Sequence, residues 1–281
     1  MTLADSRPRI AFLDVDGTIL DHGTTVAAST VEAIQSARNA GHLVYLSTGR
    51  ASGDIHPDVA AIGFDGAITN GGAYAESAGE SVLADPMPEE ATRAALDYFT
   101  AHGINYILQS DDAVYATDAV RDAFLVMLND LFRTHLDEAQ TAPQRMPQLR
   151  DVADADLTNI AKITFIGDAT DTVEQVRRDL GERYHVVAGS MPMPGGTNGE
   201  IGMAGVTKGA AIEAVLEHLG RSADDAIGIG DSWNDLEMFQ VCGVGIAMGN
   251  ADEALKVHAD EVTTSVREDG IWNAFRRHGL I

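Results

Sequence analysis

The chain has 281 residues, of which 45% are hydrophobic and 22% charged, a composition typical of a globular protein and not of a disordered or fibrous one. The 43 acidic residues outnumber the 19 lysines and arginines, and the net charge of −24 argues against nucleic acid and anionic membranes as partners. One cysteine, Cys242, excludes an intrachain disulfide, and no apolar stretch approaches the ~20 residues that cross a bilayer. The N-terminus lacks a signal-peptide pattern, so we expect a cytoplasmic protein.

The first part of the chain alternates between short apolar runs and a helical pattern. Residues 9–13 predict a buried strand, residues 29–40 an amphipathic helix, and residues 43–46 a second buried strand. Strand, helix and strand joined by short connections predict a parallel pair with a right-handed crossover. A third strand at 67–69 runs into the tripeptide Asn-Gly-Gly at 70–72.

The pattern changes after Pro86 and Pro88, where strands become richer in aromatic and β-branched residues. The patterns predict helices at 89–102, 124–136 and 173–180, strands at 104–108, 113–117, 162–166 and 184–187, and a loop at 138–156. This middle segment has the composition of a separate α+β module.

Strand and helix patterns alternate again towards the end of the chain. Helices are predicted at 210–219 and 251–259 and from residue 235, and strands at 226–231, 244–250 and 260–265. The simplest architecture is one α/β domain with a doubly wound parallel sheet, formed by residues 1–84 and 201–281. An α+β domain of residues 85–200 is then inserted between its two parts.

Two carboxylates follow the first predicted strand, in the sequence Asp-Val-Asp-Gly-Thr. In an extended segment the Cα atoms of Asp14 and Asp16 lie roughly 6.5–7 Å apart, with both side chains on one face. Open α/β sheets bind ligands at the carboxyl ends of their strands, where one carboxylate can attack while its neighbour handles a proton. A solvated acidic turn is the alternative. A calcium loop is excluded, because an EF-hand needs Asp or Asn in place of Thr18 and Gly in place of Ile19.

A second polar cluster, Gly-Asp-Ser-Trp-Asn-Asp, follows a later predicted strand. Asp231, Asn234 and Asp235 offer hard oxygen ligands, which suit magnesium better than zinc. Carboxylates gathered in one place repel each other unless a cation lies among them. A helix N-cap with acidic residues in its first turn explains the cluster equally well.

Two further positions can bind an anion. Thr48 follows the second predicted strand, where its hydroxyl can donate to a phosphoryl oxygen and the neighbouring Arg50 can add positive charge. Lys208 precedes a predicted helix and can neutralise charge that develops on a phosphoryl group. Taken singly, an ordinary turn and an exposed lysine explain these positions better. No Walker loop, GxSxG, HExxH or CxxC motif is present.

The four motifs occur in the order DVDGT, STGR, GVTKG, GDSWND. This order at strand ends resembles the haloacid dehalogenase superfamily of phosphohydrolases, and within it the Cof-type (IIB) sugar-phosphatase-like family. NGG at 70–72, GEI at 199–201, GIAMGNA at 245–251 and REDGI at 267–271 agree with it. The resemblance spans almost the whole chain and implies a Rossmann-like core with an inserted cap domain.

The resemblance implies a Mg²⁺-dependent phosphatase that acts on a small phosphorylated metabolite, such as a sugar phosphate or a flavin-pathway phosphate. Asp14 would attack phosphorus and form an aspartyl phosphate, while Asp16 would protonate the leaving oxygen and then activate water. Thr48 and Lys208 would hold the phosphoryl oxygens. These roles fit phosphoryl transfer, which depends mainly on positioning and charge neutralisation.

The same resemblance implies a Mg²⁺ site and a cap that selects the substrate. The implied metal ligands are the Asp14 carboxylate, the Asp16 backbone carbonyl and Asp231, with Asn234 and Asp235 completing or supporting the shell. Arg50, Asn70 and Glu200 are the implied substrate contacts. The sequence after Arg50, ASGDIHPDV, departs from the family, whose members often place a proline soon after this arginine.

Two other functions stay open. A phosphomutase would resemble the same cap class, and a phosphate-binding or phospho-acceptor module would share the metal and one aspartate. Such a module needs no paired acid, so Asp16 argues against it. The sequence leaves the oligomeric state undetermined.

Overall fold

The computed structural model describes residues 8–21, 23–118, 120–122, 149–189 and 197–281. The chain divides into two compact units. We call the first the core unit; it comprises Met1–Arg50, Ile55–Ala84 and Val206–Ile281. The second, the inserted unit, comprises Ala51–Asp54 and Asp85–Gly205.

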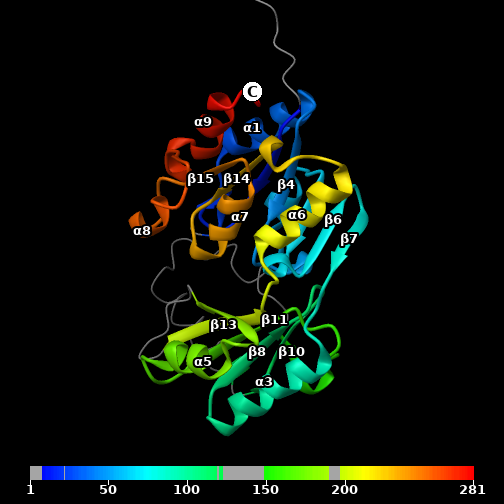
Figure 1. Ribbon diagram of the computed structural model, residues 1–281, viewed down its shortest axis with the longest axis vertical. Coiled ribbons are helices and arrows are strands. Elements are labelled where there is room, and N and C mark those ends of the chain that lie inside the picture. Colours follow the sequence, from blue (N-terminus) through cyan, green and yellow to red (C-terminus); the bar gives the residue numbers. More distant parts are fainter. Residues whose placement is uncertain (1–7, 22, 119, 123–148, 190–196) are drawn as a thin grey trace, which may run out of the picture. The chain divides into compact units, whose positions relative to one another are not determined.

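The described part of the core unit is built on an eight-stranded sheet in the order β16-β15-β14-β1-β4-β5-β6-β7 (Figure 1). The parallel strands are β1 (Ile10–Leu13), β4 (Leu43–Ser47), β5 (Gly66–Thr69), β14 (Ala226–Gly230), β15 (Val244–Ala247) and β16 (Glu261–Val262). Strands β1, β4, β5 and β14 consist almost entirely of buried residues. Such short, continuous apolar runs are typical of parallel strands covered on both faces.

An antiparallel hairpin at the sheet edge was absent from the sequence prediction. It consists of β6 (Tyr74–Ser77) and β7 (Glu80–Ala84), joined by Ala78 and Gly79. Both linking residues have positive φ angles, 52° and 82°, which a two-residue hairpin turn of type I′ requires. Alanine is an unusual residue at that position, so the turn gave no clear signal in the sequence.

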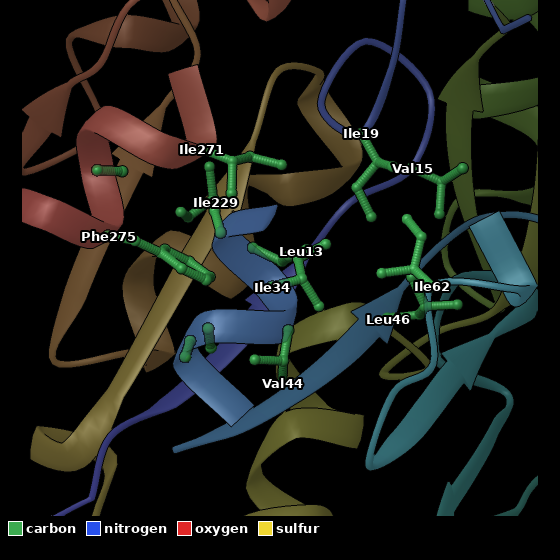
Figure 2. Packing of buried hydrophobic residues seen from close by; sticks show 14 of the residues in the cluster. Leu13, Val15, Ile19, Ile34, Val44, Leu46, Ile62, Ile229, Ile271 and Phe275 are labelled. Atoms are coloured by element: carbon green, nitrogen blue, oxygen red, sulfur yellow. The ribbon is translucent and has the colours of Figure 1, made fainter. Parts of the chain in front are cut away.

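Helices cover both faces of the core sheet. Helices α1 (Ala28–Asn39) and α9 (Gly270–Arg277) pack on one face, and α6 (Lys208–Leu219) and α7 (Leu236–Val241) pack on the other. Figure 2 shows Ile34 of α1 and Phe275 of α9 near Leu13 of β1. The predicted doubly wound α/β core is therefore confirmed, although α9 was not predicted. Shorter elements are β2 (Leu20–Asp21), β3 (Thr25–Val26), α2 (Pro57–Ala60) and α8 (Glu253–Lys256).

The inserted unit contains a six-stranded mixed sheet in its described residues, in the order β10-β9-β8-β11-β13-β12. The strands are β8 (Asn105–Gln109), β9 (Val114–Ala116), β10 (Leu149–Asp151), β11 (Lys162–Gly167), β12 (Tyr184–Ala188) and β13 (Thr197–Met203). Helices α3 (Glu89–Ala101) and α5 (Thr172–Leu180) pack on one face, where the rings of Phe99 and Phe165 stack at 5.6 Å. This arrangement confirms the predicted α+β module.

Two predictions for the inserted unit need correction. The described part of the predicted loop at 138–156 contains β10 and a 3₁₀ turn at Val152–Asp154. Strand β13 was missed, and the predicted domain boundary at residue 201 falls inside it. The sequence of β13 includes two glycines, and a Cβ atom at Gly199 would lie 2.3 Å from the ring of Phe165. The helix predicted at 124–136 lies outside the described residues.

No helix in the part of the chain that the structure describes combines the length and the apolar character that a membrane span requires.

Candidate active site

The motif residues of the core unit lie at one edge of its sheet. Asp14 directly follows β1, Thr48 follows β4, and Asp231 follows β14. These three strands are neighbours in the order β14-β1-β4. The pairing continues one residue past the strands, because Asp14 N donates to Ile229 O at 2.9 Å and Thr48 N donates to Ile68 O at 2.9 Å. The chain therefore delivers all three side chains to the carboxyl edge of the sheet.

Lys208 is the buried centre of the site. Its side chain is completely inaccessible to solvent, and Nζ donates to Asp14 Oδ1 at 2.7 Å and to Asp235 Oδ1 at 2.5 Å. The lysine is the first residue of α6, whose start is capped by Thr207: Oγ1 of Thr207 accepts a bond from Ala210 N at 3.2 Å. Helix capping therefore fixes the origin of the side chain that reaches the two aspartates.

Burial and the neighbouring charges shift the pKa values of Asp14 and Lys208. Burial raises the pKa of Asp14 well above its ordinary value, an effect opposed by the Lys208 ammonium and reinforced by Asp235 and Asp231. Burial lowers the pKa of Lys208, but Asp14 and Asp235 outweigh it and hold that pKa above the ordinary value. The lysine is therefore charged at neutral pH and neutralises part of the carboxylate charge.

Asp235 supports the loop that carries Asp231. Its Oδ2 accepts bonds from the backbone N–H groups of Asp231 and Ser232, both at 3.0 Å, while its Oδ1 accepts from Lys208. The side chain is fully buried. Both carboxylate oxygens are thus occupied by protein donors, so Asp235 acts as a support for the loop and the lysine. The alternative interpretation from the sequence, an acidic residue at a helix start, describes this contact well.

Asn234 also faces the lysine. Its Oδ1 accepts a bond from Ser232 Oγ at 2.7 Å and lies 3.4 Å from Lys208 Nζ. The side-chain oxygen that we predicted as a metal ligand is therefore used within the loop and towards the ammonium.

Asp231 has the properties of a cation ligand. Its Oδ1 is buried without a hydrogen-bond partner among the described residues. Burial, followed by the charge of Asp235, raises the pKa of Asp231 to about 7. Oxygens of Asp14, Asp231 and Asp235 all lie within 4.8 Å of one another. The three carboxylates carry −3 when ionised and Lys208 carries +1, which leaves −2 for a divalent cation to balance. The donor set therefore fits a divalent cation, with Asp14 and Asp231 as its strongest candidate ligands.

Asp16 lies outside the buried cluster and is bound by Arg50. The Arg50 guanidinium donates from Nε to Asp16 Oδ2 and from Nη2 to Asp16 Oδ1, both at 2.7 Å. The Asp16 side chain is 48% exposed, compared with 5% for Asp14. The structure thus brings two predicted site residues together in a pairing that the sequence prediction did not include.

The loops after β4 and β5 are joined by backbone hydrogen bonds. The Thr48 carbonyl accepts from Gly71 N at 3.0 Å, the Arg50 carbonyl accepts from Asn70 N at 2.7 Å, and Thr48 Oγ1 accepts from Arg50 N at 3.1 Å. Thr48 and Asn70 are both buried. Gly72, with a φ of 115°, lies so close to α6 that a Cβ atom there would be 2.1 Å from Thr207 O. The Asn-Gly-Gly loop therefore packs against the start of the helix that carries Lys208.

Glu200 belongs to the inserted unit, on β13. Its carboxylate accepts from Lys162 Nζ on β11 at 2.8 Å. Glu200 therefore forms an ion pair that links two neighbouring strands. Its predicted contact with the substrate stays a prediction.

Asn250, to which the sequence assigned no role of its own, also has a position in the site, next to the backbone of Gly17. Asn250 Nδ2 donates to Gly17 O at 2.8 Å and lies 3.3 Å from Asp231 Oδ2, while its Oδ1 accepts from Val266 N at 3.2 Å. A Cβ atom at Gly17 would lie 2.0 Å from Asp231 Oδ2. The usable signal was the place of the sequence Gly-Asn-Ala just after β15, at the same sheet edge.

The family model of haloacid dehalogenase-like hydrolases matches residues 11–275, and the chain belongs to this family. The chain is 28% identical to the pyridoxal phosphate phosphatase YbhA of Escherichia coli, over 94% of this chain and 96% of that protein. It is 29% identical to the 5-amino-6-(5-phospho-D-ribitylamino)uracil phosphatase YwtE of Bacillus subtilis, over 92% of this chain and 94% of that protein. Its fold is similar to that of the subclass IIB sugar phosphatase BT4131, with a TM-score of 0.77, 24% identity, and coverage of 97% and 100% of the two chains.

These comparisons confirm the family that the motif order predicted, the fold class, and the enzyme class of a phosphoric monoester hydrolase. Because the two chains are only 24% identical, the likeness to BT4131 supports the fold alone.

Proposed function

We propose that this protein hydrolyses a phosphate monoester of a small metabolite through an aspartyl phosphate on Asp14, with Mg²⁺ as its cofactor. The observation that carries the proposal is the buried contact between Lys208 Nζ and Asp14 Oδ1 at 2.7 Å, at the sheet edge where Asp231 also lies. A nucleophile, a cation for the phosphoryl group and a metal-ligand candidate converge there, which phosphoryl transfer requires.

The geometry supports an orientation for the nucleophile. Lys208 holds Asp14 through Oδ1, and Oδ2 has no hydrogen-bond partner among the described residues. In the first step Asp14 Oδ2 forms a bond to phosphorus, the bond from phosphorus to the leaving oxygen breaks, and Asp16 supplies the proton that this oxygen takes up. In the second step water attacks phosphorus and gives a proton to Asp16. The bond from Asp14 to phosphorus then breaks and releases inorganic phosphate.

Other residues of the chain hold the phosphoryl group. The Lys208 ammonium lies next to the attacking carboxylate and can bind a phosphoryl oxygen. Thr48 Oγ1 accepts from Arg50 N, which leaves the Thr48 hydroxyl hydrogen to donate to a second oxygen. Both groups are fixed by backbone structure before a substrate arrives, so little reorganisation accompanies the reaction.

The proposed Mg²⁺ ligands are the carboxylates of Asp14 and Asp231 and the backbone carbonyl of Asp16. Asp235 and Asn234 support this shell through the loop and the lysine. When bound, Mg²⁺ would neutralise charge on the phosphoryl oxygens and reduce their repulsion of the attacking carboxylate.

The proposed substrate is a small phosphorylated metabolite, because YbhA and YwtE are named as phosphatases of such compounds. We further propose that the inserted unit, with Glu200, selects among them. The test is a phosphate-release screen over phosphorylated metabolites without a bisphosphate activator, which a phosphomutase would need. We expect release by the wild type and none by Asp14→Asn or in excess chelator. Steady-state hydrolysis by pure Asp14→Asn would refute covalent catalysis.

The second aspartate has a test of its own. Asp16→Ala should reduce turnover by about 10²–10⁴-fold, the usual contribution of a general acid. It should leave Mg²⁺ affinity largely unchanged, because the backbone carbonyl remains. Turnover equal to that of the wild type would remove Asp16 from the mechanism.

A further inference from the structure

The geometry points to Arg50 as a positioning residue for the general acid, in place of the substrate contact that the sequence suggested. We propose that its guanidinium orients the Asp16 carboxylate for proton transfer to the leaving group. The inference rests on the proposed function, since it concerns the residue assigned there as acid and base.

The geometry of the contact between Arg50 and Asp16 supports this role. Two parallel N–H···O bonds of 2.7 Å join the guanidinium to both carboxylate oxygens of Asp16. A planar fork of this kind fixes the direction of a carboxylate as well as its distance, which a lysine ammonium cannot do. Asp16 is 48% exposed, so neighbouring side chains leave its rotamer poorly restricted. Arg50 therefore restricts the orientation of the Asp16 side chain, as burial does for Asp14.

The backbone of Arg50 is fixed by hydrogen bonds. Its N–H donates to Thr48 Oγ1 at 3.1 Å, and its carbonyl accepts from Asn70 N at 2.7 Å. Both partners are buried. The backbone of Arg50 is therefore held by hydrogen bonds within and between the loops after β4 and β5. Because the Arg50 backbone is fixed, its side chain can hold the exposed Asp16 carboxylate in one orientation.

A neighbouring turn lies on one side of the pair. A Cβ atom at Gly23, in the turn between β2 and β3, would lie 3.5 Å from Asp16 Oδ1 and 3.9 Å from Arg50 Nη2. These are ordinary contact distances, so the turn at Gly23, which has a φ of 72°, lies beside the pair without crowding it. Because both of its oxygens are engaged and one side is covered, Asp16 has few alternative orientations.

The test uses leaving groups that need a proton to different degrees. Alkyl oxygens leave poorly without protonation, whereas p-nitrophenolate leaves without it. For Arg50→Ala we expect kcat with the best alkyl phosphate of the screen to fall about tenfold or more. We expect kcat with p-nitrophenyl phosphate to fall less than about threefold, and KM to change little for both. Arg50→Lys should recover only part of the loss, since it keeps the charge and lacks the fork.

The chain offers a matched control. Arg38 and Asp65 form the same kind of fork in the core unit, with bonds of 3.0 Å and 2.9 Å, and Asp65 precedes β5 at the opposite, amino edge of the sheet. Arg38→Ala should lower the unfolding temperature without changing the ratio of the two kcat values. In an Asp16→Ala background, Arg50→Ala should have no further effect on kcat if Arg50 acts through Asp16.

Each outcome decides the inference. Equal losses of kcat for both leaving groups, or a rise in KM with unchanged kcat, would overturn it and return Arg50 to substrate binding. A further loss in the Asp16→Ala background would also overturn it. If the wild type releases no phosphate from any alkyl ester, the proposed function is refuted, and the proposed role of Arg50 is refuted with it. A midpoint of thermal unfolding near that of Arg38→Ala shows that Arg50→Ala is folded.

Discussion

Replacing Lys208 by methionine tests the electrostatic centre of this site. Methionine is similar to lysine in length and shape and lacks the ammonium group. The lysine side chain is completely buried, and its Nζ is 2.7 Å from Asp14 and 2.5 Å from Asp235. Lys208→Met therefore leaves two buried carboxylates close to each other without their shared cation.

The expected loss follows from the burial of these charges. Removing one partner of a buried ion pair destabilises a protein by about 3–5 kcal/mol, because the remaining charge is left without compensation. For a chain of this size each kcal/mol shifts the unfolding temperature by roughly 2–4 °C, so we expect a decrease of about 10 °C. The pKa of Lys208 is raised, so its stabilising effect is present throughout the neutral range and is lost only at very high pH.

Thermal unfolding in chelator at pH 8 and pH 5.5 measures this loss. The decrease for Lys208→Met should be larger at pH 8, because the pKa of Asp14 is already raised and its carboxyl protonates more readily at pH 5.5. Adding Asp14→Asn to the variant should recover part of the stability, since one of the two charges disappears. An unfolding temperature within about 2 °C of the wild type at pH 8 corresponds to a loss of less than roughly 1 kcal/mol in the free energy of unfolding. Such a result would refute the idea that Lys208 balances buried carboxylates.

Three further predictions concern the metal site. Because the pKa of Asp231 is raised to about 7, the metal-free protein should lose stability as the pH rises from about 4 to 7. Its affinity for Mg²⁺ should rise up to about tenfold per pH unit from pH 5 and level off above pH 7. Isothermal titration with MgCl₂ across this range tests it, and a pH-independent affinity would contradict the assignment of Asp231 as a ligand. Asn250→Ala should weaken Mg²⁺ binding by about 10–100-fold, because it removes the amide beside Asp231 Oδ2. Asn273→Ala, whose side chain binds Thr264 and Glu268, is the control, and equal affinities of the two variants would refute that role for Asn250.

The sequence was sufficient to predict the edge at which the site lies. Strands β1, β4 and β14 are short, mostly apolar and followed by polar turns, so their ends were clear. Parallel strands then place Asp14, Thr48 and Asp231 at one edge without further information. The contact between Lys208 and Asp14 was less accessible, since it depends on how α6 packs. There the motif order and its family resemblance supplied the expectation.

Side-chain pairings could not be predicted from the pattern. Asp16 and Arg50 come from different loops, and spacing within either loop contains no information about the other. Asp235 looked like a ligand as much as a helix-start residue, and only its two backbone donors distinguish the interpretations. Asn250 was the last residue of a predicted strand, and its partners Gly17, Asp231 and Val266 are all distant in sequence, so the pattern gave no sign of these contacts.

Gly72 has a consequence for how this protein can diverge. It has no reactive group, yet even one methyl group there would meet the Thr207 carbonyl and displace the residue that follows, the lysine of the site. A side chain at position 72 would therefore disturb the site without contacting a substrate. At Gly72 the space available to a side chain, and not its chemistry, therefore limits which residues the position can accept.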